Sequence, residues 1–120
     1  MDIETLRNHC IAKKGVTEGF PFGEQTLVFK VMGKMFALVS IDNAEFVNLK
    51  CEPEYALELR EQYDGMIRPG WHMNKKLWNS VSLIDGLSYE LIKSLIDHSY
   101  DEVVKTLKKK DKIALEEMES

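Results

Sequence analysis

The chain has 120 residues, of which 44% are hydrophobic and 30% are charged, and its formal net charge is −4 at pH 7. A chain of this length builds one hydrophobic core, so we expect a single domain over residues 1–120. The acidic balance excludes a general attraction to nucleic acid or to anionic membranes, so a site for a polyanion has to be a local basic patch.

Residues 2–14 predict a helix, because Ile3, Leu6 and Cys10 fall on one face and Gly15 follows as a typical helix end. The next stretch, "VTEGFPFG" (16–23), is interpreted as a loop, because glycine and proline interrupt it. The first strand is therefore expected only after this loop.

An alternation of period two in "QTLVFKVMGKMFALVSI" (25–41) predicts two strands, joined by a two-residue turn at Gly33–Lys34. A turn at Asp42–Asn43 then leads into "EFVNLK" (45–50), the third strand. The connections are too short for crossovers, so the three strands are expected to form an antiparallel meander.

The second half begins with a helix over "PEYALELREQY" (53–63), in which Pro53 occupies the first turn. Strands near 70–74 and 77–84 are expected to form a hairpin around Lys75–Lys76. Ser88 is predicted to cap the last long helix and Asp101 a second short one, with residues 109–120 fraying or extending it. The order α-β-β-β-α-β-β-α predicts a two-layer α+β domain, in which helices cover one face of an antiparallel five-stranded sheet.

The two cysteines, Cys10 and Cys51, lie far apart and are expected to be reduced and largely buried. The N-terminus lacks the apolar segment of a signal peptide, and no apolar run is long enough to span a bilayer. We therefore expect a cytoplasmic protein.

Five stretches of the chain resemble the MmcQ/YjbR family. They are "FPFG" (20–23), "VFKVMGKMFALVS" (28–40), "VNLKCEPEYALELREQY" (47–63), "PGWHMNKKLWNSV" (69–81) and "LIDHSY" (95–100). The resemblance implies a CyaY-like fold, similar to bacterial frataxin and to secretion chaperones, and DNA binding through a double-wing motif. It implies no catalytic residues. Trp71 and Leu77 depart from the family pattern, in which a tyrosine and a histidine are common.

The region 65–84 is the candidate nucleic-acid contact, because it carries Arg68, Lys75 and Lys76 and no acid. Lysines at a hairpin tip can bind backbone phosphates, while neighbouring polar or aromatic side chains reach a base or sugar. The candidate contact residues are Arg68, His72, Asn74, Lys75, Lys76 and Trp78. The alternative is that both lysines are solvated turn residues that discourage edge pairing.

Strand parity separates the two tryptophans. If both segments are strands, Trp71 shares a face with Met73, whereas Trp78 shares a face with Ser80 and Ser82. The pattern therefore predicts that Trp71 is a core residue and that Trp78 is partly exposed.

The sequence offers no metal or catalytic motif. His9, His72 and His98 show no ligand spacing with each other or with the cysteines, and His98 is interpreted as a partner of a helix C-terminus. The acids at 52–64 and 116–119 suggest iron only by analogy with the frataxin-like fold, since solvent-facing carboxylates are the default. Because nucleophile elbows, P-loops and dinucleotide-binding motifs are also missing, we expect neither an enzyme nor a cofactor.

The second functional hypothesis is a protein-interaction adaptor of the secretion-chaperone type. Its partner would bind the second face of the sheet, represented by Val28, Met32 and Phe46. An exposed apolar face would favour this adaptor, and a continuous basic groove would favour nucleic acid. We expect a monomer or a weak dimer in either case.

Overall fold

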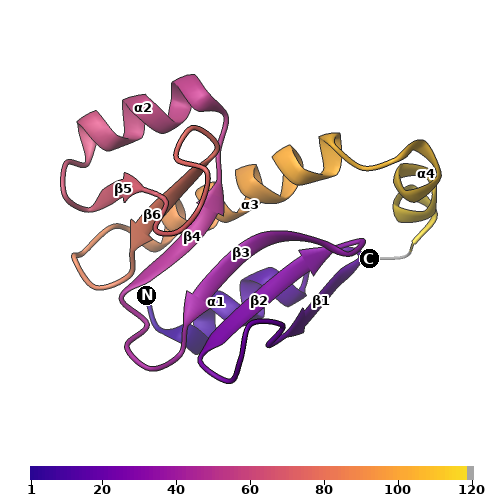
Figure 1. The fold of residues 1–120 in the computed structure, drawn as a ribbon, viewed down its shortest axis with the longest axis horizontal. Coiled ribbons are helices and arrows are strands. Elements are labelled where there is room, and N and C mark those ends of the chain that lie inside the picture. Colours follow the sequence, from indigo (N-terminus) through magenta and orange to yellow (C-terminus); the bar gives the residue numbers. More distant parts are fainter. Residues whose placement is uncertain (119–120) are drawn as a thin grey trace.

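The computed structural model describes residues 1–118, and over this range the chain forms four helices and a six-stranded antiparallel sheet (Figure 1). The strand order is β1-β2-β3-β4-β6-β5. The strands are β1 (Val16–Gly19), β2 (Thr26–Val31), β3 (Lys34–Ser40), β4 (Phe46–Lys50), β5 (Ile67–Pro69) and β6 (Trp78–Ser82). The helices are α1 (Ile3–Ile11), α2 (Pro53–Gln62), α3 (Tyr89–Lys105) and α4 (Lys109–Glu117). Residues 119–120 of the predicted tail lie outside the described range.

The α+β class, the β2-β3-β4 meander and the helical layer on one face are confirmed, but the count of five strands is wrong. The additional strand, β1, occupies part of the predicted loop and pairs with β2 from Val16–Val31 to Gly19–Val28. Its four residues have no alternating pattern, so pairing with β2 rather than intrinsic propensity makes it a strand. A bidentate contact between Arg7 of α1 and Glu18, at 2.7 and 2.6 Å, also holds β1.

The turn between β2 and β3 lies one residue earlier than predicted. Met32 and Gly33 are its central residues, with φ angles of 49° and 85°. Positive φ at both central positions defines a type I′ turn, whose twist matches that of the flanking strands.

Helix α3 is continuous through Asp101, so the predicted second helix capped by that residue is wrong. Its N-cap is confirmed, because the Ser88 side chain accepts a hydrogen bond from the Leu91 backbone at 3.1 Å. Further along, the Ser99 hydroxyl donates to the Phe36 carbonyl at 2.5 Å and accepts from the Lys50 backbone at 2.8 Å. These bonds fasten the middle of α3 to the sheet, and the chain bends only before α4.

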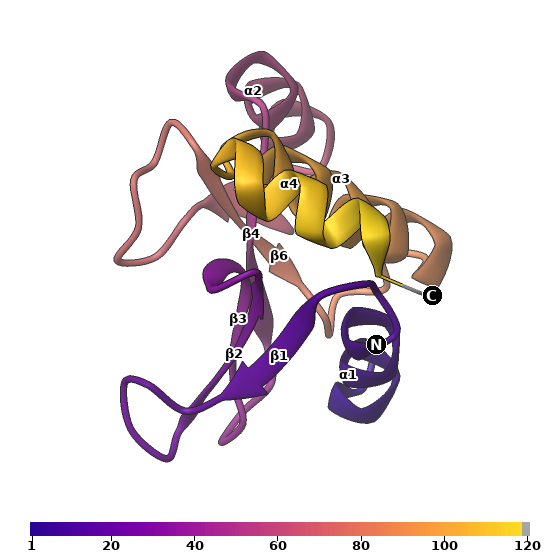
Figure 2. The ribbon, with the colours of Figure 1, turned by 90° about the vertical axis from the view of Figure 1, so that its right-hand side faces the viewer.

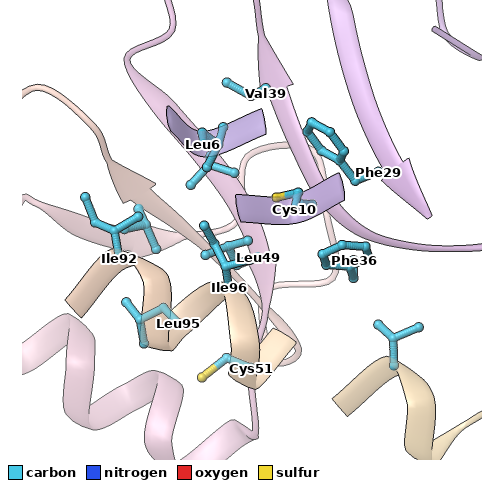
Figure 3. Packing of buried hydrophobic residues seen from close by; sticks show 14 of the residues in the cluster. Leu6, Cys10, Phe29, Phe36, Val39, Leu49, Cys51, Ile92, Leu95 and Ile96 are labelled. Atoms are coloured by element: carbon cyan, nitrogen blue, oxygen red, sulfur yellow. The ribbon is translucent and has the colours of Figure 1, made fainter. Parts of the chain in front are cut away.

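The main core lies between the sheet and the helices (Figure 3). Leu6 of α1 and Ile96 of α3 pack there against Phe29, Phe36 and other residues of the covered sheet face. Cys10 and Cys51 belong to the same core as free thiols, and burial raises the pKa of each to about 12. Both thiols are therefore protonated and unreactive at neutral pH.

No helix in residues 1–118 has the length and apolar character that crossing a membrane requires.

Candidate binding groove on the open sheet face

The face of the sheet opposite the helices is partly covered by two loops. Figure 2 shows the β1–β2 loop and the β5–β6 loop projecting from the sheet on the side away from α1 and α3. Beneath them lies a second, smaller apolar cluster of Val28, Leu38 and Trp78, separate from the main core. Met35, Met73 and Leu77 pack against this cluster.

A groove of about 730 Å³ remains open on this face. It is lined by sheet residues and by both loops, and we call it the open-face groove. Its lining consists of Phe22, Thr26, Met35, Leu38, Val39, Ser40, Asn43, Glu45, Phe46, Asn48, Arg68, Pro69, Trp71, His72, Met73 and Ser80. The size falls within the range of pockets that hold small molecules or single recognition elements.

Trp71 lies at this groove with its side chain exposed, and hydrogen bonds hold its backbone. Its amide donates to the Ser80 hydroxyl at 3.1 Å, and its carbonyl accepts from the Asn48 side-chain amide at 3.3 Å. Ser80 in turn donates to the Asn48 side-chain oxygen. The three bonds form a closed set that fixes the Trp71 peptide to β4 and β6, and we call it the Trp71 clamp.

The burial predicted for the two tryptophans is reversed. Trp71 is 71% exposed, whereas Trp78 is 8% exposed and belongs to the second cluster. Strand parity does not apply to Trp71, because residues 70–77 are not a strand: His72 adopts a φ of 59°, and the loop folds back over the sheet. Gly70 permits this path, since a Cβ at that position would lie 2.7 Å from the Trp78 Cβ.

Arg68 and His72 are the two predicted contact residues that the groove brings together. The Arg68 guanidinium lies 4.8 Å from the centre of the Phe46 ring, and its Nε donates to the Gly65 carbonyl at 2.8 Å. The His72 ring packs edge-on against Trp71, with centroids 4.7 Å apart.

The predicted contacts Asn74, Lys75 and Lys76 lie in the β5–β6 loop but do not line the groove. The Asn74 side-chain oxygen accepts from the Lys76 backbone at 3.0 Å, so it stabilises the loop. Lys75 reaches the Gly70 carbonyl at 3.3 Å. Within residues 1–118, neither lysine forms an ion pair with a carboxylate.

Arg60 of α2 supports this loop from the other side. Its Nε donates to the Asn79 side chain at 2.7 Å, and its Nη2 donates to the backbone carbonyls of Lys75 and Trp78. The "PGWHMNKKLWNSV" segment is therefore a structural unit in which Gly70, Asn79 and Ser80 set the path of the loop that presents Trp71.

Phe46 was expected on the second face of the sheet and does line the groove, whereas Phe22, Asn48 and Ser80 are groove residues that were not predicted. Phe22 lies in a stretch, residues 16–23, that glycine and proline mark only as a loop, and strand alternation alone gives no reason to expect Ser80 at a site. The usable signal was Asn79 and Ser80 inside a strand, since polar residues buried in a sheet require hydrogen-bonding partners.

The histidines lie in separate places. His9 Nε2 contacts Asp97 Oδ1 at 2.7 Å, whereas His98 lies in the middle of α3, where its Nε2 accepts from the Glu52 backbone at 3.1 Å. The predicted interaction of His98 with a helix C-terminus is therefore wrong. Across the described part of the chain, no three His, Cys, Asp or Glu side chains are grouped to hold a metal ion.

Comparison with known proteins identifies relatives over most of the chain. The YjbR family model matches residues 11–102. The uncharacterised protein YbdF of Escherichia coli O157:H7 is 43% identical over 109 residues, which cover 90% of this chain and 88% of that protein. The uncharacterised protein YjbR of Escherichia coli K12 is 35% identical over 108 residues, covering 89% of this chain and 91% of that protein.

Two solved structures share the fold. The Deinococcus radiodurans protein DR2400 superimposes with a TM-score of 0.88 at 37% identity, covering 95% of this chain and 87% of that one. A Pseudomonas syringae protein gives a TM-score of 0.70 at 26% identity, covering 85% of this chain and 98% of that one. The family match, the sequence identities and the shared fold agree, and the chain belongs to the YjbR family.

Proposed function

We propose that this protein binds nucleic acid through the open-face groove and the β5–β6 loop beside it. The observation that carries the proposal is the distribution of charge. Lys30, Lys50 and Arg68 lie on the open face by strand alternation, and Lys75 and Lys76 lie on the loop. The helical side carries many of the acids, including Glu54, Glu58 and Glu61 on α2 and Asp97, Asp101 and Glu102 on α3.

This distribution provides a local basic patch on a chain whose net charge is −4. Arg68, Lys75 and Lys76 are the phosphate contacts, and Lys30 and Lys50 add to the attraction. Glu45 is the one carboxylate among the groove-lining residues of the described chain, and it weakens the patch. Contacts of this number give salt-dependent and largely non-specific binding, with a Kd on the order of 10⁻⁴–10⁻⁶ M.

The roles of the other predicted contacts change. His72 remains a secondary contact, because it lines the groove beside Trp71. Asn74 contributes through the shape of the loop, and Trp78 supports the loop from below. Trp71 takes the place of Trp78 as the aromatic contact.

The test is titration of fluorescently labelled DNA at low and moderate salt with the wild type and the Lys75→Ala/Lys76→Ala variant. Lys109→Ala/Lys110→Ala is the matched control, because it removes the same charge from exposed lysines of α4. We expect the loop variant to bind DNA more weakly. The slope of the logarithm of the binding constant against the logarithm of salt concentration should decrease in magnitude by about 2, while the control retains the wild-type slope. Equal binding by the wild type and the loop variant, or absence of binding at low salt, would contradict the proposal.

A second candidate function is the protein-interaction adaptor, and the apolar floor of the groove favours it. Leu38, Phe46 and Met73 line the groove together with Trp71, a residue type enriched at binding hot spots. The surface differs from the expected one, because Val28 is buried in the second cluster and Met32 packs against the main core.

Affinity purification with the wild type and a Trp71→Ala/Phe46→Ala variant tests the adaptor. A partner retained by the wild type and lost from the variant supports it, whereas absence of a stable partner counts against it.

A further inference from the structure

We infer that the open-face groove binds single-stranded nucleic acid, with Trp71 and Phe22 stacking on unpaired bases; this inference rests on the proposed function. Trp71 is 71% exposed and Phe22 is 65% exposed. They come from the β5–β6 and β1–β2 loops, respectively, and both line the same groove. Two exposed aromatic rings from different loops therefore border one concave surface.

The Trp71 ring is presented by a fixed backbone. The Trp71 clamp joins its peptide to Asn48 and Ser80, two residues in the middle of the sheet. The Trp71 ring belongs to neither apolar cluster, so it does not take part in the packing of the core. A platform ordered in this way before binding loses little conformational freedom when a base stacks on it.

Base stacking requires a free base face, and this requirement separates single strands from duplexes. In a duplex the faces are covered by neighbouring base pairs, and proteins contact the base edges in the grooves. In a single strand each base can place its face on an aromatic ring. The groove suits this second mode, because the exposed rings of Trp71 and Phe22 border it. The Asn48 and Ser80 side chains already use part of their hydrogen-bonding capacity to hold the Trp71 backbone and to bond to each other.

Arg68 supplies the complementary charge. Phe46 supports its guanidinium from one side, and its Nε is bonded to the Gly65 carbonyl. Among the described residues its terminal nitrogens donate no hydrogen bond, so they are free to contact a phosphate. An aromatic platform and a cation on one groove are the two components that proteins combine to bind single strands with little sequence preference.

The test compares a labelled 15-nucleotide oligothymidylate with a duplex of equal length, by fluorescence anisotropy at one salt concentration. The proteins are wild type, Trp71→Ala, Trp71→Phe and Tyr89→Ala. Tyr89 is a matched control, because it is an exposed aromatic residue at the start of α3 that does not line the groove. Thermal unfolding of each variant establishes that it remains folded.

We expect the single strand to bind at least about tenfold more tightly than the duplex. Trp71→Ala should weaken single-strand binding about tenfold or more and leave duplex binding unchanged, since stacking is lost only where base faces are free. Trp71→Phe should retain most of the affinity, and binding should quench tryptophan fluorescence.

Two results separate failure of this inference from failure of the proposed function. If Lys75→Ala/Lys76→Ala weakens binding but the duplex binds as tightly as the single strand, or Trp71→Ala behaves like Tyr89→Ala, nucleic-acid binding stands and base stacking is overturned. If neither probe binds at low salt, both fail. Retention of a protein partner that depends on Trp71 would then assign the groove to the adaptor function.

Discussion

The two faces of the sheet are built from the same strands but differ in how far their side chains are buried. On the covered face, Phe29, Phe36 and Val47 are fully buried beneath the helices. On the open face, apolar burial stops at the small cluster under the β5–β6 loop, and aromatic and basic side chains remain accessible. The covered face holds the domain together, and the open face keeps aromatic and basic side chains exposed to solvent.

The two faces should therefore respond differently to mutation. Substitutions on the covered face remove packing and are expected to change the free energy of unfolding most. Substitutions around the open-face groove are expected to change the position of the β5–β6 loop at a smaller cost in stability. Three predictions test this separation, in order of decreasing effect, and a fourth concerns the ion pairs of Asp97 with His9 and Lys13.

Phe36→Ala should destabilise the protein most, by about 3–5 kcal/mol, because it leaves a cavity in the main core. Phe36 is fully buried, and its ring packs edge-on against Tyr100 with centroids 5.5 Å apart. Urea unfolding followed by circular dichroism measures the loss. Phe22→Ala is the control on the open face and should change stability by less than about 0.5 kcal/mol. Similar losses for the two variants would contradict the separation of the faces.

Gly70→Ala should destabilise by about 1–3 kcal/mol, because an added Cβ would lie 2.7 Å from the Trp78 Cβ and 3.1 Å from its carbonyl oxygen. The loop has to move away from β6, so the tryptophan emission spectrum should also change. Gly19→Ala is the matched control, since a Cβ there meets nothing within 4 Å. A wild-type spectrum and stability for Gly70→Ala would show that the loop is not held against β6.

Ser80→Ala should cost about 1 kcal/mol, because the Trp71 amide loses its hydrogen-bond acceptor. The indole N–H resonance of Trp71 should shift and broaden in NMR spectra as the clamp opens. Ser94→Ala is the control, because that hydroxyl donates within α3, to the Leu91 carbonyl at 2.7 Å. An unchanged Trp71 resonance in Ser80→Ala would mean that the clamp does not hold the ring.

Substitution of Asp97 should give the smallest change in the free energy of unfolding, and this change should depend on pH. Burial alone would raise the pKa of this carboxyl, but hydrogen bonds from Lys13 and His9 outweigh burial and hold the pKa below its usual value. A carboxyl with a lowered folded-state pKa stabilises the protein above its unfolded pKa of about 3.9, and this stabilisation is lost as pH falls through the folded value.

Asp97→Asn should therefore reduce stability at pH 7 by less than about 1 kcal/mol, since the Asp97 side chain is 46% exposed and solvent screens the pair. The difference from wild type should shrink when unfolding is measured below pH 4. A difference of equal size at pH 7 and pH 3 would exclude the ion pairs as its source.

Much of the fold was predictable because local patterns and tertiary packing agree. Period-two alternation in residues 26–40 marked β2 and β3, and Pro53 and Ser88 marked the starts of α2 and α3. The basic character of the 65–84 region was also visible, and it drew attention to Arg68 and His72, which line the groove.

The errors arose where contacts distant in sequence decide local structure. β1 depends on pairing with β2 and on the Arg7–Glu18 contact, neither of which leaves a pattern in residues 16–19. Helix α3 continues past Asp101 to Lys105, and its Ser99 hydroxyl is bonded to the sheet backbone at Phe36 and Lys50, contacts that no local pattern around Asp101 records.

Sequence patterns are enough to assign the class of fold and the kinship, because strands and helices impose different periods on apolar residues. They do not assign the covered face throughout, since Phe36, Ala37, Leu38 and Val39 are buried in succession on β3. Which tryptophan is exposed depends on the three-dimensional path of the chain. Side chains alternate between the two faces only where the backbone is extended. The backbone is not extended here, because His72 has a positive φ and Gly70 packs closely against Trp78. The Trp71 clamp then joins residues from β4, β6 and the loop, and a contact among three segments leaves no period in any one of them.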